Sequence, residues 1–196
     1  MPHINRTAKE ITAKIVYYGP GLCGKTTNLE HIYSRVDPRS RGRMMSLATD
    51  QERTLFFDLL PVSAGRIGDF NLRFQLYTVP GQVYYNASRR VVLQNVDGIV
   101  FVADSQPSRL EANIESMQNL YDNMASFDYD MDEVPLVLQY NKRDVPGALP
   151  IETLESALNP EQLPAWEAVA IKGIGVFETL GEIMRAVEAN LRERLG

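Results

Sequence analysis

Residues 17–30 read YYGPGLCGKTTNLE, and residues 19–26 within them fit the pattern G-x-x-x-x-G-K-[ST]. The preceding run, Ile11 to Gly19, is apolar and β-branched and predicts a strand that stops at the glycine. The following segment, Lys25 to Arg35, spaces its apolar residues at helical intervals and predicts a helix. A glycine-rich loop between a strand and a helix indicates a site that binds phosphate through backbone N–H groups.

The composition predicts one domain over residues 1–196 with a proper hydrophobic core, since 44% of the chain is hydrophobic. No run approaches the roughly 20 apolar residues that span a bilayer. Neither terminus carries a signal peptide or a lipid-anchor motif. A single cysteine excludes an internal disulfide and predicts a cytoplasmic location. The net charge of −5 predicts no nucleic-acid partner, and an arginine cluster over residues 35–43 is interpreted as a solvated loop face.

The rest of the chain alternates apolar runs with amphipathic ones, which predicts an α/β fold with a mostly parallel sheet. The expected strands are 53–64, 70–79, 96–104, 134–141 and 165–171, and the expected further helices are 110–124 and 176–194. The turn-rich residues 65–69 join the first two of these strands and predict one antiparallel edge strand. Residues 38–51 form a long polar connection, which favours a functional or mobile loop.

In the phosphate loop, the glycines permit positive φ angles and close approach of a phosphate. Lys25 is predicted to reach the β- and γ-phosphates, and the Thr26 hydroxyl is predicted to bind Mg²⁺. The alternative is a chance glycine-rich turn. Cys23 is interpreted as a small loop residue covered by nucleotide, against a reactive thiol near a helix N-terminus. The residues expected to hold phosphate here are Gly21, Leu22, Cys23, Gly24, Lys25, Thr26 and Thr27.

The base is indicated by Asn141, Lys142, Arg143 and Asp144, which follow a buried strand at the carboxyl edge of the sheet. Guanine presents two adjacent N–H donors that one carboxylate accepts together, whereas adenine offers an unprotonated N1. Asp144 therefore favours guanine, while Asn141 holds neighbouring loops and the stem of Lys142 lies over the ring. The alternative for this motif alone is a polar turn at a helix entry.

Together these motifs resemble a small Ras-like GTPase, and the variant details resemble the MglA-type GTPases of bacterial gliding motility and cell polarity. The likeness is carried by GPGLCGKTTNL, ERTLFFDLLP, TVPGQVYYNASR, QYNKRD and AIKGIGVFETL and spans nearly the whole chain. It implies a three-layer P-loop fold, GTP and GDP as ligands, Mg²⁺, and an activating partner of the MglB-like roadblock type. It also implies recruitment to a cell pole. In Ras-like proteins a further turn offers a backbone N–H to guanine, and alignment places Ala170 there.

The second switch of such proteins reads D-x-x-G-Q, but this chain has Thr78-Val79-Pro80-Gly81-Gln82. A neutral hydroxyl replaces the carboxylate expected near Mg²⁺, so the metal's surroundings are in question. Gly81 is predicted to give its N–H to the γ-phosphate. Gln82 is predicted to orient the attacking water, against the alternative of an ordinary polar loop residue.

The first switch needs a threonine that completes the metal site. Thr54 is chosen over Thr49 because its spacing to Thr78 suits the Ras-like layout better. Arg53 is hypothesised to act as an arginine finger in cis, ordered by a partner, because such an arginine raises rates by roughly 10³–10⁵. The alternative is that Arg53 is one more solvated cation.

These features predict a GTPase switch that turns over slowly without a partner, with loops 38–54 and 80–90 ordered by the γ-phosphate. One rival is a non-hydrolysing module that only reports the bound nucleotide, which the threonine at position 78 favours and Gln82 opposes. Another rival is an ATP-dependent kinase or ATPase on the same loop, which Asp144 opposes.

Overall fold

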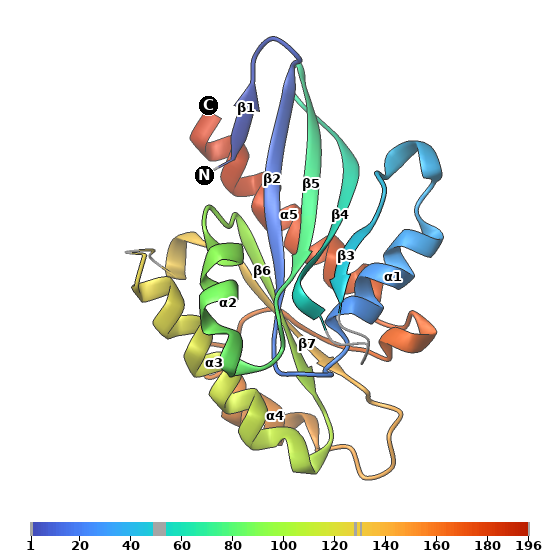
Figure 1. The fold of residues 1–196 in the computed structure, drawn as a ribbon, viewed down its shortest axis with the longest axis vertical. Helices are drawn as coiled ribbons and strands as arrows, with labels where there is room; N and C mark the ends of the chain where they lie inside the picture. The colour runs from blue at the N-terminus through green and yellow to red at the C-terminus, as the bar shows by residue number, and fades with distance from the viewer. Residues whose placement is uncertain (1, 49–53, 128, 130, 196) are drawn as a thin grey trace.

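The structure, a computed structural model, describes residues 2–48, 54–127, 129 and 131–195. An eight-stranded sheet forms its centre, with the order β3-β4-β5-β2-β6-β7-β8 and β1 beside β2 (Figure 1). The strands are β1 (His3–Asn5), β2 (Glu10–Tyr18), β3 (Met45–Ala48), β4 (Thr54–Ile67), β5 (Phe70–Thr78), β6 (Gly98–Asp104), β7 (Leu136–Asn141) and β8 (Ala165–Glu167).

The sheet is mixed, as an α/β chain with a hairpin requires. β2 pairs in parallel with β5 and β6, and the parallel part continues through β7 to β8. The predicted fold class is therefore confirmed. The antiparallel part is larger than the single edge strand expected, because β4 pairs with β5, β3 with β4, and β1 with β2.

Helices cover both faces of the sheet and give it two separate cores. They are α1 (Lys25–Arg35), α2 (Asn86–Leu93), α3 (Leu110–Ala125), α4 (Ile151–Leu158) and α5 (Val176–Leu195), with 3₁₀ turns η1 (Pro38–Ser40), η2 (Val83–Tyr85), η3 (Pro107–Arg109), η4 (Met131–Glu133) and η5 (Ala170–Lys172). Leu29 of α1 and Ile183 of α5 join one core, whereas Val92, Leu120 and Leu154 of α2, α3 and α4 join the other. Figure 1 shows α2 and α3 together on one side and α5 behind β2.

The elements β1, α2 and α4 were not among those expected, and two segments with an expected structure differ from it. Residues 38–48 contain η1 and β3, because Ser46 and its neighbours extend the sheet beyond β4 instead of forming an irregular loop. The strand expected at 165–171 ends at Glu167. Beyond it, Val169 bridges to Ile174, and η5 occupies residues 170–172 as a tight turn whose next residue, Gly173, has a φ of 76°.

Tyr17 and Tyr18 provide a stability prediction because both are fully buried on β2 but differ at the hydroxyl. In the described part of the chain the Tyr17 hydroxyl has no hydrogen-bond partner, and burial raises its pKa far above the usual range. We expect Tyr17→Phe to raise the free energy of unfolding by about 1 kcal/mol, because it removes an unsatisfied polar group without changing the packing. Chemical denaturation measures the change.

The neighbouring tyrosine is the matched control. The Tyr18 hydroxyl donates to Asn119 Oδ1 at 2.6 Å and accepts from Asn123 at 3.1 Å. Tyr18→Phe should therefore lower the free energy of unfolding by about 1–3 kcal/mol. Equal losses in the two variants would contradict the assignment.

Candidate functional site

The predicted site segments meet at one edge of the sheet. The strands β2, β5 and β7 end at Tyr18, Thr78 and Asn141, and β2 and β5 are parallel neighbours. The loops that follow them lie at the lower end of the sheet in Figure 1. In open α/β sheets, ligands bind in the crevice outside these carboxyl ends.

Two positions of the phosphate loop are compatible only with glycine. Gly19 has a φ of +141°, and a Cβ added there would lie 2.2 Å from the backbone oxygen of Val102. Gly24 has a φ of +105°, and its Cβ would lie 2.2 Å from Asn141 Nδ2. The loop therefore packs backbone to backbone against β6 and side by side with the residue that ends β7.

The Lys25 ammonium is held inside this loop. Its Nζ donates to the carbonyl oxygens of Gly19 at 3.1 Å and Pro20 at 2.7 Å, and to Cys23 Sγ at 3.6 Å. The side chain is only 6% exposed, and this burial lowers the pKa of Lys25. Burial disfavours the charged form of Lys25, and the negative charge of a bound phosphate would favour it again. Cys23 is fully buried, which favours its interpretation as a small loop residue over a reactive thiol.

The remaining loop residues lie as a phosphate cradle requires. Gly21 and Leu22 form the outer part of the loop, and Leu22 has a φ of 63° and is 65% exposed. Thr26 and Thr27 follow Lys25 in the first turn of α1 and are both half-buried. N–H groups in the first turn of a helix lack intrahelical partners and are available to an anion.

Asn141 ties three loops together, as expected. Its Nδ2 donates to the Cys23 carbonyl at 2.7 Å, and its Oδ1 accepts the Ala170 N–H at 2.9 Å. The Ala170 N–H, which the sequence alignment predicts to bind guanine, is therefore engaged in a hydrogen bond with Asn141. Ile171, the following residue in η5, has an 80% exposed side chain.

Lys142 is positioned by Asp104, a residue that sequence reasoning missed. Lys142 has a φ of 63° and donates from Nζ to Asp104 Oδ2 at 2.7 Å. Asp104 ends β6, is fully buried, and also accepts from the backbone N–H and the side chain of Gln106. The only available signal was a carboxylate at the end of an otherwise apolar strand.

Asp144 lies at the open side of the same edge. Its carboxylate pairs with Lys172 at 2.8 Å and is 34% exposed. The hydrogen bond from Lys172 holds the pKa of Asp144 below its usual range, so the carboxylate is ionised at neutral pH. Lys172 was not predicted, because the alignment of the turn ended one residue before it.

A carboxylate does stand beside Thr26, although position 78 lacks one. Asp58 of β4 is fully buried, and its Oδ2 accepts from the Thr26 hydroxyl at 2.6 Å and from the Thr78 hydroxyl at 2.7 Å. Its Oδ1 accepts from the Ser46 hydroxyl of β3. Asp58 thus brings a carboxylate to the hydroxyls of Thr26 and Thr78.

Neighbouring strands position this group of oxygen atoms. Ser46 and Asp58 are register partners between β3 and β4, and Asp58 lies one step beyond the Leu59–Tyr77 pair of β4 and β5. The Asp58 N–H also donates to Thr78 Oγ1 at 2.8 Å. In the described residues no three His, Cys, Asp or Glu side chains cluster. Hydroxyl and carboxylate oxygens that complement substrate phosphates suit Mg²⁺, which rarely uses an all-protein cage.

The turn after β5 lies against the phosphate loop. A Cβ on Gly81 would lie 2.3 Å from the Gly21 Cα, so only glycine allows this approach. Gln82 is exposed and precedes η2. The proposed γ-phosphate sensor and water-orienting residue therefore adjoin the phosphate loop.

The first-switch residues are only partly placed. Arg53 and Thr49 lie outside the described residues, so the arginine-finger hypothesis and the runner-up threonine stay predictions. Thr54 is the first residue of β4, the strand that carries Asp58.

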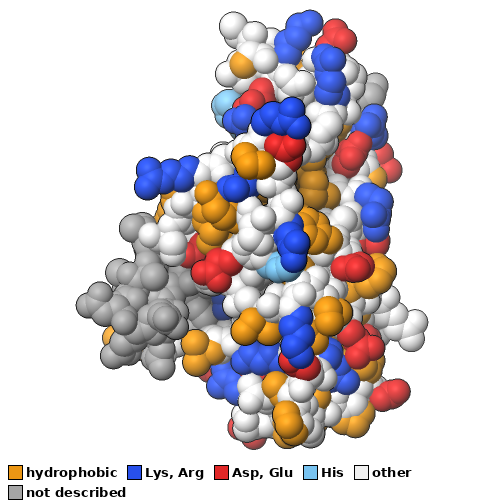
Figure 2. Space-filling view, turned by 90° about the vertical axis from the view of Figure 1, so that its right-hand side faces the viewer, with side chains coloured by type: hydrophobic (Ala, Val, Ile, Leu, Met, Phe, Trp, Pro, Cys, Tyr) orange, Lys and Arg blue, Asp and Glu red, His pale blue; other side chains and the backbone are white. Residues whose placement is uncertain are grey.

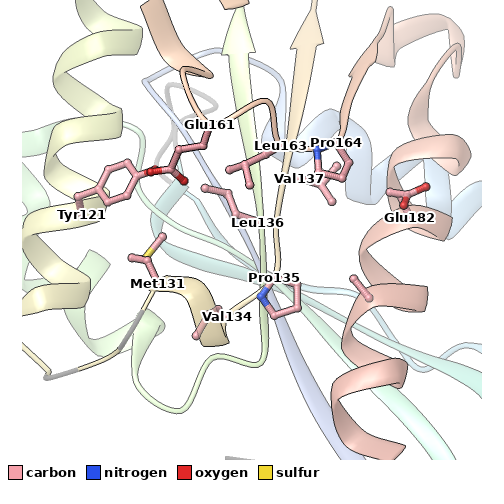
Figure 3. A pocket seen from close by; sticks show the side chains of 11 residues that line it. Tyr121, Met131, Val134, Pro135, Leu136, Val137, Glu161, Leu163, Pro164 and Glu182 are labelled. Carbon is pink, nitrogen blue, oxygen red and sulfur yellow. The ribbon is translucent and has the colours of Figure 1, made fainter. Parts of the chain in front are cut away.

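A cavity lies apart from this edge. It has a volume of about 290 Å³ and lies at the amino end of β7, lined by Tyr121, Leu136, Leu163 and Glu182 among others (Figure 3). Figure 2 shows positive and negative side chains interspersed over the face it displays. None of the described helices is both long and apolar enough to cross a membrane.

Comparison with known proteins agrees with this geometry. The model of the ADP-ribosylation factor family matches residues 3–187. The chain is 53% identical over 193 residues to the mutual gliding-motility protein MglA of Myxococcus xanthus (strain DK1622), covering 98% of this chain and 99% of that protein. It is 32% identical over 115 residues to ADP-ribosylation factor-like protein 4D of Mus musculus, covering 58% of this chain and 55% of that protein.

These matches confirm the resemblance to MglA-type GTPases that the motifs indicated. They extend far beyond the phosphate loop and include the strands and turns that form the site. The chain belongs to the ADP-ribosylation factor family and is a small GTPase with a Ras-like fold.

Proposed function

We propose that the chain is a single-domain, Mg²⁺-dependent switch that binds GTP and GDP and hydrolyses GTP slowly until a partner protein assists. The observation that carries this proposal is the double contact of Asn141, which joins Cys23 of the phosphate loop to Ala170 of the base-side turn. It places a phosphate cradle and the carboxylate of Asp144 on one continuous edge.

For the base, Asp144 accepts the two adjacent donors of guanine. Its pairing with Lys172 supports this role because it keeps the carboxylate ionised. The Ala170 N–H is engaged by Asn141, so we assign the guanine oxygen to the N–H of Ile171 instead. Lys142 is proposed to cover the ring with its stem, and the hydrogen bond of its ammonium to Asp104 supports this role.

For the metal, Thr26 and Asp58 are the residues that would hold Mg²⁺, together with Thr54 of the first switch. The convergence of Thr26, Thr78 and Ser46 on one buried carboxylate supports this assignment. When bound, the ion neutralises phosphate charge. Asp58 contributes the negative charge that Thr78 lacks, and Thr78 orients that carboxylate.

For hydrolysis, Gln82 orients the attacking water, and Lys25 stabilises charge on the β- and γ-phosphates. Ras-like sites without an arginine turn over on the order of 10⁻⁴ s⁻¹. Arg53 is proposed to supply the missing cation from the first switch once a partner orders it. The position of Thr54 as the first residue of β4, the strand that carries Asp58, supports the idea that this segment adjoins the metal.

The proposed cellular role is control of gliding motility and cell polarity, with recruitment to a cell pole. It rests on the 53% identity to the gliding-motility protein of Myxococcus xanthus. An MglB-like roadblock protein is the proposed activator. Tyr84, which is 91% exposed beside the second switch, and Leu22 in the phosphate loop give such a partner apolar anchors.

The test is phosphate release from GTP under single-turnover conditions. We expect measurable release by the wild type with Mg²⁺, and about tenfold slower release by Gln82→Leu because the water is no longer oriented. Gln118→Leu, on the exposed side of α3, is the matched control and should behave as wild type. With an activating partner, Arg53→Ala should lose the stimulation.

Each rival function makes a different prediction in the same assay. Tight GTP binding with no release, with or without partner, would show a non-hydrolysing module. Protection from heat by ATP above that by GDP would point to an ATP-dependent enzyme.

A further inference from the structure

Arg89 of α2 is a fully buried arginine. Its acceptors are carbonyl, hydroxyl and amide oxygens, and no described carboxylate pairs with it. Burying a charge costs several kcal/mol unless hydrogen bonds replace its water. The neighbouring Arg90 is exposed, with its guanidinium 5.4 Å from the ring centroid of Phe127.

The guanidinium of Arg89 joins the second switch to the phosphate loop. Nε donates to the Pro80 carbonyl at 2.9 Å, and Nη2 donates to the Gly81 carbonyl at 2.7 Å. The same Nη2 donates to the Gly19 carbonyl at 3.2 Å. One side chain therefore spans the turn after β5 and the start of the phosphate loop.

The opposite side of the guanidinium is anchored to α3. Nη1 donates to Asn119 Oδ1 at 2.7 Å and to the Tyr18 hydroxyl at 3.4 Å, and Nη2 lies 3.5 Å from Ser116 Oγ. Asn119 in turn donates to Asn86 at the start of α2. Because these anchors are themselves buried or half-buried, the guanidinium has a defined position.

This arrangement orients two peptide groups. In a trans peptide the carbonyl and the following N–H point in opposite directions, and no described peptide bond is cis. Since the carbonyls of Pro80 and Gly81 face Arg89, the N–H groups of Gly81 and Gln82 face away from it. The contact of Gly81 with Gly21 places this turn directly against the phosphate loop.

We propose that Arg89 is a positioning residue for GTP hydrolysis, which holds Pro80 and Gly81 against the phosphate loop and presents the N–H groups of Gly81 and Gln82 to the γ-phosphoryl group. The inference rests on the proposed GTP hydrolysis. Its consequence is selective, because guanine and the diphosphate are assigned to Asn141, Asp144 and residues 21–27, whereas the backbone partners of Arg89 are Pro80, Gly81 and Gly19.

The experiment compares Arg89→Lys and Arg89→Gln with the matched control Arg90→Gln on the same helix. Lysine keeps the charge but replaces the three guanidinium nitrogens, which separately reach Pro80, Gly81 and Asn119, with a single ammonium nitrogen. We expect single-turnover hydrolysis by both Arg89 variants to slow by about 10- to 100-fold, since small misplacements of reacting groups have effects of this size. The Kd for GDP should change by less than about threefold, while binding of a non-hydrolysable GTP analogue weakens more than binding of GDP.

Thermal unfolding of the Mg²⁺·GDP form checks that the variants fold. If neither variant folds, Asn119→Ala is tested in their place. It removes one anchor of the guanidinium and leaves Arg89 itself unchanged. It should slow hydrolysis with unchanged GDP affinity. Unchanged hydrolysis, or equal losses of GDP and GTP-analogue affinity, would overturn the proposal. Hydrolysis by the wild type in the same assay tests the proposed function. The role of Arg89 is tested separately, by the ratio of the variant's hydrolysis rate to that of the wild type.

Discussion

Asp144→Asn is expected to weaken GDP binding by about 100-fold or more, because hydrogen bonds to a charged group contribute roughly 1.5–3 kcal/mol each and two are altered. The amide keeps one acceptor oxygen and turns an NH₂ donor toward a guanine donor. Xanthine carries a carbonyl where guanine carries its amine, so the variant should gain affinity for xanthosine diphosphate. Competition against a fluorescent GDP analogue measures both changes.

Lys172→Met is the matched control for this prediction. It breaks the 2.8 Å ion pair with Asp144 but leaves the carboxylate in place. At neutral pH the carboxylate remains ionised without Lys172, so GDP affinity should fall only slightly. Equal affinity of Asp144→Asn and wild type for GDP would mean that the base lies elsewhere on this edge.

Asp58→Asn is expected to raise the Mg²⁺ concentration needed to slow GDP release by about 10- to 100-fold, the usual effect of losing a supporting group at a metal site. The variant keeps the shape of the side chain and some of its hydrogen bonds but removes the negative charge that accepts hydrogen bonds from the Thr26 and Thr78 hydroxyls. Titration of Mg²⁺ against the GDP dissociation rate measures the shift.

The control and the rescue for Asp58 come from the same chain. Asp37→Asn, at an exposed carboxylate that pairs with Arg39, should leave the Mg²⁺ dependence unchanged. Adding Thr78→Asp to Asp58→Asn returns a carboxylate to the same group of side chains and should restore much of the affinity. An unshifted Mg²⁺ requirement in Asp58→Asn would contradict the assignment.

The phosphate loop and its helix were predictable from sequence because their demands are local. Gly19 and Gly24 need backbone conformations that other residues rarely adopt, and α1 begins and ends at the predicted residues. The buried strands β6 and β7 were predictable for the same reason, since they are short runs that are mostly apolar.

Asp58 and Arg89 were not predictable because their roles depend on register and burial. Asp58 follows two phenylalanines in a strand, and only the pairing of β3, β4 and β5 brings it to Thr26. Arg89 and Arg90 are adjacent and identical in type, and only the packing of α2 against α3 decides which one is buried. The hydrogen bond from the Ala170 N–H to the Asn141 side chain was not predictable for a related reason, since it depends on how two distant segments pack together.

The central claim is that Asp58 supplies, from a neighbouring strand, the carboxylate that the second switch lacks at Thr78. A crystal structure of the chain with Mg²⁺ and a non-hydrolysable GTP analogue tests it most directly. We expect the Asp58 carboxylate to lie at the metal, directly or through one water molecule, beside the Thr26 hydroxyl. An Asp58 side chain turned away from the metal, with the site completed by other residues, would contradict it.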